Sequence, residues 1–165
     1  MGCAAGCRID RTQSGFLQAL TSRQIPVRLV LDTNVVLDLL HFSDPAVSPI
    51  LHAIANHMAH CYASSATLDE LRRVLTYSEF QLDATAQTTL LMRYQAWVSV
   101  AEPVSGSARK MPRCSDPDDQ MFLELAASIQ ADFLISKDKA VLALKRHTGL
   151  GFKILTPSEA GTLWV

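Results

Sequence analysis

The chain has 165 residues, of which 48% are hydrophobic, and its formal net charge at pH 7 is -1. This length and apolar content are enough to bury one core, so we expect a single domain with a short extension. The balanced charge excludes the overall basic field of many nucleic-acid-binding proteins. Any contact with nucleic acid must therefore depend on local cationic patches or on metal ions.

The cysteines and the first residues predict the compartment of the protein. The four cysteines are irregularly spaced in a chain that is large enough to fold without disulfides, which favours reduced thiols. The start of the chain has the features of neither a secretion signal nor a myristoylation site. We expect a cytoplasmic protein without membrane contact, with an N-terminal extension over residues 1–25 and a single domain over residues 26–165.

The segment 27–34 carries the first functional signal. Its apolar run ends abruptly at Asp32, and the apolar residues that follow, 35–40, suit a helix packed against a sheet. Asp32 is thus predicted at a strand-to-helix corner, which is where ligands bind in open α/β folds. At this point the acid could be a helix cap, a metal ligand or a general base.

Further along the chain, predicted helices alternate with predicted strands. Ser64 or Ser65 is the N-cap of one helix, Pro117 fits the first position of another, and Thr156 to Glu159 has the pattern of a capping box. The alternation predicts a mostly parallel sheet with helices on both faces. Helices are expected over about 46–57, 65–75, 84–97, from 117 and from 139 to 149, and strands over about 61–63, 98–100, 133–135 and 152–155.

Acidic residues from four segments are predicted to face one edge of this sheet. Asp32 and Asp138 follow strands, Asp119 lies in the first turn of a helix, and Glu70 lies on the polar side of the helix 65–75. Oxygen ligands without matching His or Cys favour Mg²⁺ or Mn²⁺ over zinc. Two carboxylates about 4 Å apart repel by roughly 4 kcal/mol at an effective dielectric constant near 20, and a cation would relieve this repulsion. It would also activate water and hold a phosphate oxygen, as phosphodiester hydrolysis requires.

Each acid also has a simpler interpretation. Taken alone, any one of them is a helix cap or a solvated charge in roughly half of such cases. Asp116 is ambiguous, since it is close enough in sequence to act as an outer ligand, whereas Asp38 and Asp69 are expected to face solvent. The coincidence of several acids at one edge is what favours a functional site.

Several blocks of sequence, in a fixed order, resemble the PIN-domain ribonucleases, and among them the VapC-like toxins of toxin–antitoxin systems. The resemblance covers residues from about 27 to 160. It rests on the blocks Leu31-Asp32-Thr33-Asn34-Val35-Val36, Leu68-Asp69-Glu70-Leu71, Asp116-Pro117-Asp118-Asp119-Gln120-Met121-Phe122 and Phe133-Leu134-Ile135-Ser136-Lys137-Asp138.

The resemblance implies a three-layer α/β/α sandwich that cleaves single-stranded RNA in a metal-dependent reaction. It also implies a cognate antitoxin that covers the site, and homodimers are common in the family. Gln120 stands where many relatives carry another acid. The implied site consists of Asp32, Glu70, Asp119 and Asp138 around Mg²⁺ or Mn²⁺, with Asn34, Ser136 and Asp116 as supporting residues.

RNA would have to approach this acidic site, so cations near it are candidates for phosphate binding. We expect Arg109, Lys110, Arg113 and Lys137 to bind phosphates, and we expect Arg73 to be an ordinary solvated charge.

Two rival functions remain open. One is a catalytically inert PIN-like module that binds RNA or a protein partner. The other is a phosphatase with Asp32 as its nucleophile, but such sites use a second aspartate two residues later, where this chain has Asn34. The cysteines and histidines suggest no nucleophilic dyad and no zinc site.

Overall fold

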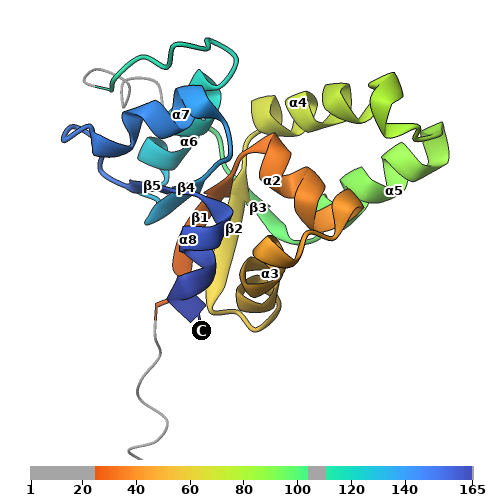
Figure 1. Cartoon of the computed structure of the whole chain (residues 1–165), viewed down its shortest axis with the longest axis horizontal. Coiled ribbons are helices and arrows are strands. Elements are labelled where there is room, and N and C mark those ends of the chain that lie inside the picture. Colours follow the sequence, from red (N-terminus) through yellow and green to blue (C-terminus); the bar gives the residue numbers. More distant parts are fainter. Residues whose placement is uncertain (1–24, 104–110, 165) are drawn as a thin grey trace, which may run out of the picture.

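The computed structural model describes residues 25–103 and 111–164. Five strands form one sheet in the order β3-β2-β1-β4-β5, and all four pairings are parallel (Figure 1). The strands are β1 (Val27–Leu31), β2 (Ala59–Ala63), β3 (Val98–Val100), β4 (Phe133–Ile135) and β5 (Lys153–Leu155).

The central strand β1 divides the core into two layers. Leu29 and Leu31 belong to one buried cluster and Val30 to the other, because side chains alternate across a strand. Helices cover both faces of the sheet, so the α/β sandwich expected from the sequence is confirmed (Figure 1). The helices are α2 (Thr33–Leu37), η2 (Asp38–Phe42), η3 (Pro45–Val47), α3 (Ser48–Ala55), α4 (Ser65–Leu75), η4 (Ser78–Phe80), α5 (Ala84–Gln95), α6 (Gln120–Ser128), α7 (Lys139–Ala143), η6 (Leu144–Arg146), α8 (Pro157–Gly161) and η7 (Thr162–Trp164).

The start of α6 differs from the prediction made from the sequence. Pro117 was expected at the first helical position, but α6 begins only at Gln120. The Asp118 N–H donates to Asp116 Oδ1 at 2.9 Å, which closes a local turn before the helix can start. Asp119 consequently takes the N-cap position, yet its side chain makes no capping hydrogen bond, so its oxygens stay available.

The parallel arrangement places the carboxyl ends of β1 and β4 next to each other. Leu31 pairs with Ile135, and the Asp32 N–H donates to the Ile135 carbonyl at 3.0 Å. Residues that follow these two strands therefore lie at one edge of the sheet. The proposed division between residues 25 and 26 stays a prediction, because residues 1–24 lie outside the described part of the chain. Within that part, no helix combines the length and the apolar character that a membrane crossing requires.

Ser64 is the N-cap of α4, which settles the choice between two adjacent serines. Its hydroxyl accepts from the Thr67 N–H at 3.3 Å, and Thr67 Oγ1 accepts from the Ser64 N–H at 2.9 Å. Ser64 is fully buried, whereas Ser65 is exposed. The capping box fixes where the helix that carries Glu70 begins.

Replacing Ser64 tests this assignment. We expect Ser64→Ala to lower the free energy of unfolding by about 1–2 kcal/mol, because the buried Thr67 N–H loses its acceptor. Ser65→Ala is the matched control and should change it by less than about 0.5 kcal/mol. Urea denaturation measures both values, and equal losses in the two variants would contradict the assignment.

Candidate functional site

Asp32 is a buried carboxylate at the end of β1. It is only 2% exposed, and Ser136 Oγ donates to Asp32 Oδ2 at 2.6 Å. Burial raises the pKa of Asp32, and the hydrogen bond from Ser136 acts against this increase. Ser136 was predicted to support the site, and its hydroxyl contacts Asp32 directly.

Asp138 is held by the same serine. The Asp138 N–H donates to Ser136 Oγ at 2.9 Å, and Asp138 Oδ1 accepts from the Ala140 N–H at 2.6 Å, which caps α7. Asp138 is therefore both a helix cap and a neighbour of Asp32, and its negative charge contributes to the raised pKa of Asp32. Of the two alternatives weighed for this acid, the helix cap is confirmed, and its role in a functional site stays a prediction.

Asp119 approaches these two acids from the start of α6. Its pKa is raised to about 7, first by burial and then by the negative charges of Asp32 and Asp138. Asp119 Oδ2 is buried and has no hydrogen-bond partner among the described residues. An unpaired buried carboxylate oxygen is costly, and it is the kind of atom that a cation or a proton satisfies.

Asp116 lies at the outer side of this group. Its side chain is exposed, and its charge adds to the raised pKa of Asp119. A hollow of about 600 Å³ opens beside it and reaches Asp138. Ser115, Asp116, Pro117, Asp138, Lys139, Ala140 and Ala143 line this hollow.

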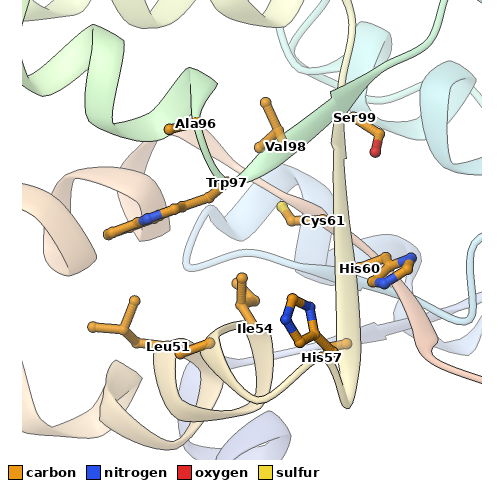
Figure 2. A pocket seen from close by; sticks show the side chains of 11 residues that line it. Leu51, Ile54, His57, His60, Cys61, Ala96, Trp97, Val98 and Ser99 are labelled. Carbon is orange, nitrogen blue, oxygen red and sulfur yellow. The ribbon is translucent and has the colours of Figure 1, made fainter.

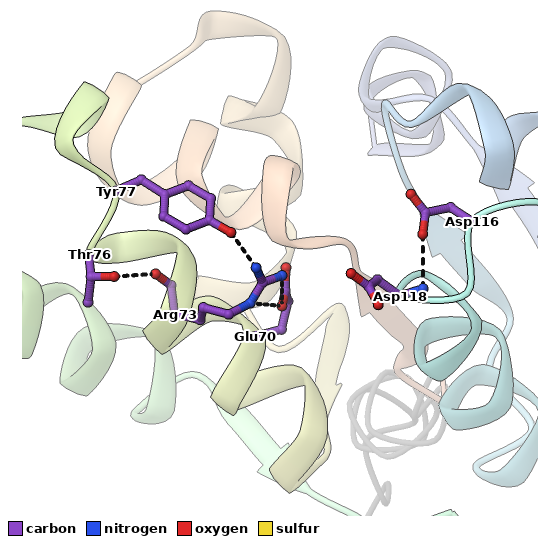
Figure 3. Close-up of polar contacts among 6 residues, drawn as sticks. All are labelled: Glu70, Arg73, Thr76, Tyr77, Asp116 and Asp118. Atoms are coloured by element: carbon purple, nitrogen blue, oxygen red, sulfur yellow. Dashed lines mark hydrogen bonds and ion pairs between the residues drawn. The ribbon is translucent and has the colours of Figure 1, made fainter.

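Glu70 is not brought into the group. Glu70 Oε2 instead accepts from Arg73 Nε at 2.9 Å and from Arg73 Nη2 at 2.6 Å (Figure 3). Glu70 is also absent from the groups that shift the pKa of Asp32 or Asp119. Arg73 is exposed, as expected for a solvated charge, and it also forms an ion pair with Glu70.

The expected supporting residue Asn34 acts through its backbone. Its side chain is exposed, whereas hydrogen bonds from the backbone of Asn34 and Thr33 lower the pKa of Asp32. Sequence reasoning missed Thr33, whose Oγ1 is buried beside Asp32 without a partner among the described residues. Its position directly after Asp32 was the available signal.

Gln120, which stands where many relatives carry an acid, does not extend the acidic group. Its Oε1 accepts from the Cys114 N–H at 2.8 Å, so this hydrogen bond holds the segment before α6 against the start of the helix.

Lys137 is paired with a second acid. Its Nζ lies 2.8 Å from Asp38 Oδ2, and Asp38 is only 6% exposed. The expectation that Asp38 faces solvent is wrong, because its carboxylate is buried and pairs with Lys137 from the loop after β4, which supplies the compensating charge. Arg113 is exposed, and Arg109 and Lys110 lie outside the described residues.

The three carboxylates are suitable ligands for a hard cation, although they do not yet stand at metal-binding distances from one another. Asp32, Asp119 and Asp138 offer only oxygen atoms, and one of these atoms is buried and unpartnered. Among residues 25–103 and 111–164, however, no three His, Cys, Asp or Glu side chains already stand at metal-binding distances. Binding of a cation would therefore have to draw the carboxylates closer together.

A second cavity of about 560 Å³ lies elsewhere, between α3, β2 and the start of β3 (Figure 2). It is lined mainly by apolar side chains, with Trp97 across from Leu51. Burial raises the pKa of Cys61 in its wall to about 12, so this thiol is protonated at neutral pH and is a poor nucleophile. None of the site acids lines this cavity.

Asp119 predicts a pH-dependent stability in the presence of a chelator. Because its pKa is about 7 in the folded state and near 3.8 when unfolded, the unfolded chain loses this proton first as the pH rises. The folded state is thus penalised increasingly between about pH 4 and pH 7. We expect Asp119→Asn to equal the parent near pH 4 and to be more stable by about 2 kcal/mol near pH 8. Urea denaturation measures this difference, with the exposed Asp118→Asn as control, and a difference independent of pH would contradict the prediction.

Comparison with known proteins agrees with the fold. The model of the PIN domain family matches residues 28–140, a range that contains Asp32, Glu70, Asp119 and Asp138. No curated protein matches the chain at a significant level. A chain in the crystal structure of VapBC2 from Rickettsia felis, bound to a DNA fragment from their promoter, is 13% identical and aligns with a TM-score of 0.58. The alignment covers 78% of the present chain and 98% of that chain. The protein therefore belongs to the PIN domain family, whose members are in general metal-dependent nucleases.

Proposed function

We propose that this protein is a metal-dependent endoribonuclease that hydrolyses single-stranded RNA and serves as the toxin of a toxin–antitoxin pair. The observation that carries this proposal is the convergence of Asp32, Asp119 and Asp138 from three separate segments, with one buried Asp119 oxygen left unpartnered. Membership in the PIN domain family supports the nuclease part.

Asp32, Asp119 and Asp138 would hold Mg²⁺ or Mn²⁺, with Asp116 and Glu70 at the periphery. When bound, the cation would lower the pKa of a coordinated water and stabilise the charge that develops on the phosphate. Ser136 keeps the Asp32 carboxylate oriented through its hydrogen bond of 2.6 Å.

Protons compete with the cation for the same oxygen atoms. Since the pKa of Asp119 is raised to about 7 without metal, a proton competes with the cation for this side chain near neutral pH. The apparent affinity for the cation should therefore increase as the pH rises from about 6 to about 8.

The toxin role rests on two similarities. The motif blocks resemble those of VapC-like toxins, and a structural neighbour is a chain of VapBC2 from Rickettsia felis. We propose by analogy that a cognate antitoxin covers the site, that the protein forms homodimers and that it acts in the cytoplasm. A small neighbouring gene that encodes a DNA-binding fold would support this role over that of a housekeeping nuclease.

Cleavage of labelled single-stranded RNA tests the activity. We expect cleavage with Mg²⁺ or Mn²⁺, none with a chelator, and a loss in Asp32→Asn larger than the roughly 10- to 100-fold effect of removing a supporting residue. Asp69→Asn, which changes an exposed acid on α4, is the control and should retain full activity. Cleavage that persists in chelator and in Asp32→Asn would exclude the mechanism. A chain that binds RNA without cutting it would instead be the inert module.

Thermal melting tests the cation site without any RNA. We expect millimolar Mn²⁺ to raise the Tm of the parent, because a ligand that binds only the folded state stabilises it. The shift should be much smaller in Asp119→Asn and unchanged in Asp69→Asn. An unchanged Tm of the parent over this concentration range would reject the assigned ligands.

A further inference from the structure

Arg73 is a cation held by two neighbouring side chains on the surface of α4. Its Nε and Nη2 donate to Glu70 Oε2, and its Nη1 donates to the Tyr77 hydroxyl (Figure 3). These contacts come from one face of α4 and from the residue after its C-cap, so one rigid element holds the whole guanidinium group. The Arg73 side chain nevertheless remains 52% exposed.

The Glu70–Arg73 pair lies opposite the turn before α6. Figure 3 shows Asp118, from the turn before α6, with its carboxylate directed toward the Glu70–Arg73 pair. Asp118 is near enough to contribute to the raised pKa of Arg73, although Glu70 makes the larger contribution. Asp119 is the next residue along the chain, so the turn that Arg73 faces leads directly into the acidic group.

Two of the five N–H donors of Arg73 are not used by Glu70 or Tyr77. An arginine has five such donors in a planar fork, and the contacts to Glu70 and Tyr77 engage three. The remaining donors, one on Nη1 and one on Nη2, lie on an exposed group. Such a pair matches the oxygens of a phosphate.

The adjacent Arg72 has a different environment. It pairs with Asp69 and lines a groove between α4 and α5, together with Leu75 and Leu91. Arg72 therefore has the same charge and the same helix as Arg73, but it is directed to another surface. This makes it a matched comparison.

We infer that Arg73 binds a backbone phosphate of the RNA strand beside the site of cleavage, and that Glu70 and Tyr77 position its guanidinium group. The inference rests on the proposed function, because it takes single-stranded RNA as the substrate. A polyanion must approach a group of carboxylates, and a cation fixed at their edge lowers the electrostatic cost of that approach. In this arrangement Glu70 acts by positioning Arg73, and it is not a ligand of the Mg²⁺ or Mn²⁺ ion.

Binding of a fluorescent single-stranded RNA tests the inference separately from cleavage. All variants are made in the Asp32→Asn background, and anisotropy is measured over a series of salt concentrations. We expect Arg73→Ala to weaken binding about 10-fold and to reduce the slope of log K against log salt by about 0.7. Arg72→Ala should bind as its background does, and Arg73→Lys should recover part of the affinity because its charge remains. Equal effects of Arg73→Ala and Arg72→Ala would overturn the inference.

Kinetics and melting distinguish phosphate binding from a role in the cation site. In the otherwise unchanged protein, Arg73→Ala should raise KM with little change in kcat, since the contact is made before and during the reaction. Mn²⁺ should raise the Tm of Arg73→Ala and Glu70→Gln as much as that of the parent. Loss of this shift in Glu70→Gln would make Glu70 a cation ligand and overturn its positioning role. Failure of the parent to cleave RNA would reject the proposed function. The anisotropy series would still show whether Arg73 contributes to RNA binding.

Discussion

The Ser136 hydroxyl group is the contact on which the arrangement of the site depends. It donates to the buried Asp32 carboxylate at the end of β1 and accepts from the Asp138 N–H after β4. Because β1 and β4 are parallel neighbours, one hydroxyl group can join the two segments. It also compensates in part for the burial of Asp32, whose charged form would otherwise be strongly disfavoured. The site is thus positioned by the adjacent ends of two strands of the sheet.

The carboxylates of Asp32, Asp119 and Asp138 repel one another in this arrangement. Asp119 approaches Asp32 and Asp138 closely enough to have its pKa raised to about 7, and one of its oxygens is buried without a partner among the described residues. A proton on one of the carboxylates can relieve the repulsion, and a divalent cation would relieve it more completely. A local destabilisation of this kind is common at functional sites and is rarely retained at positions that serve stability alone.

The cations around the site are themselves held by acids. Lys137 is bound to the buried Asp38, and Arg73 is bound to Glu70 on the surface of α4. Both cations are about half exposed, Lys137 at 46% and Arg73 at 52%, and each keeps donors that its acid does not use. They differ in geometry, because Arg73 offers its remaining donors in a planar fork that matches a phosphate, whereas Lys137 is a point charge that stabilises the buried Asp38. Arg73 is therefore a candidate for phosphate binding beside Lys137, which the sequence analysis did not expect.

Local signals in the sequence determined the elements and the family. The apolar run before Asp32, the serine cap of α4 and the alternation of strands and helices all act over a few residues, and the structure has them at the expected places. Only the tertiary structure showed that Lys137 pairs with the buried Asp38, because these residues are 99 positions apart in the chain and meet through packing. The pair of Glu70 with Arg73 and the start of α6 at Gln120 are instead set by contacts within a few residues, which the sequence analysis did not use. No short pattern in the chain encodes a contact between segments as distant as those of Asp38 and Lys137.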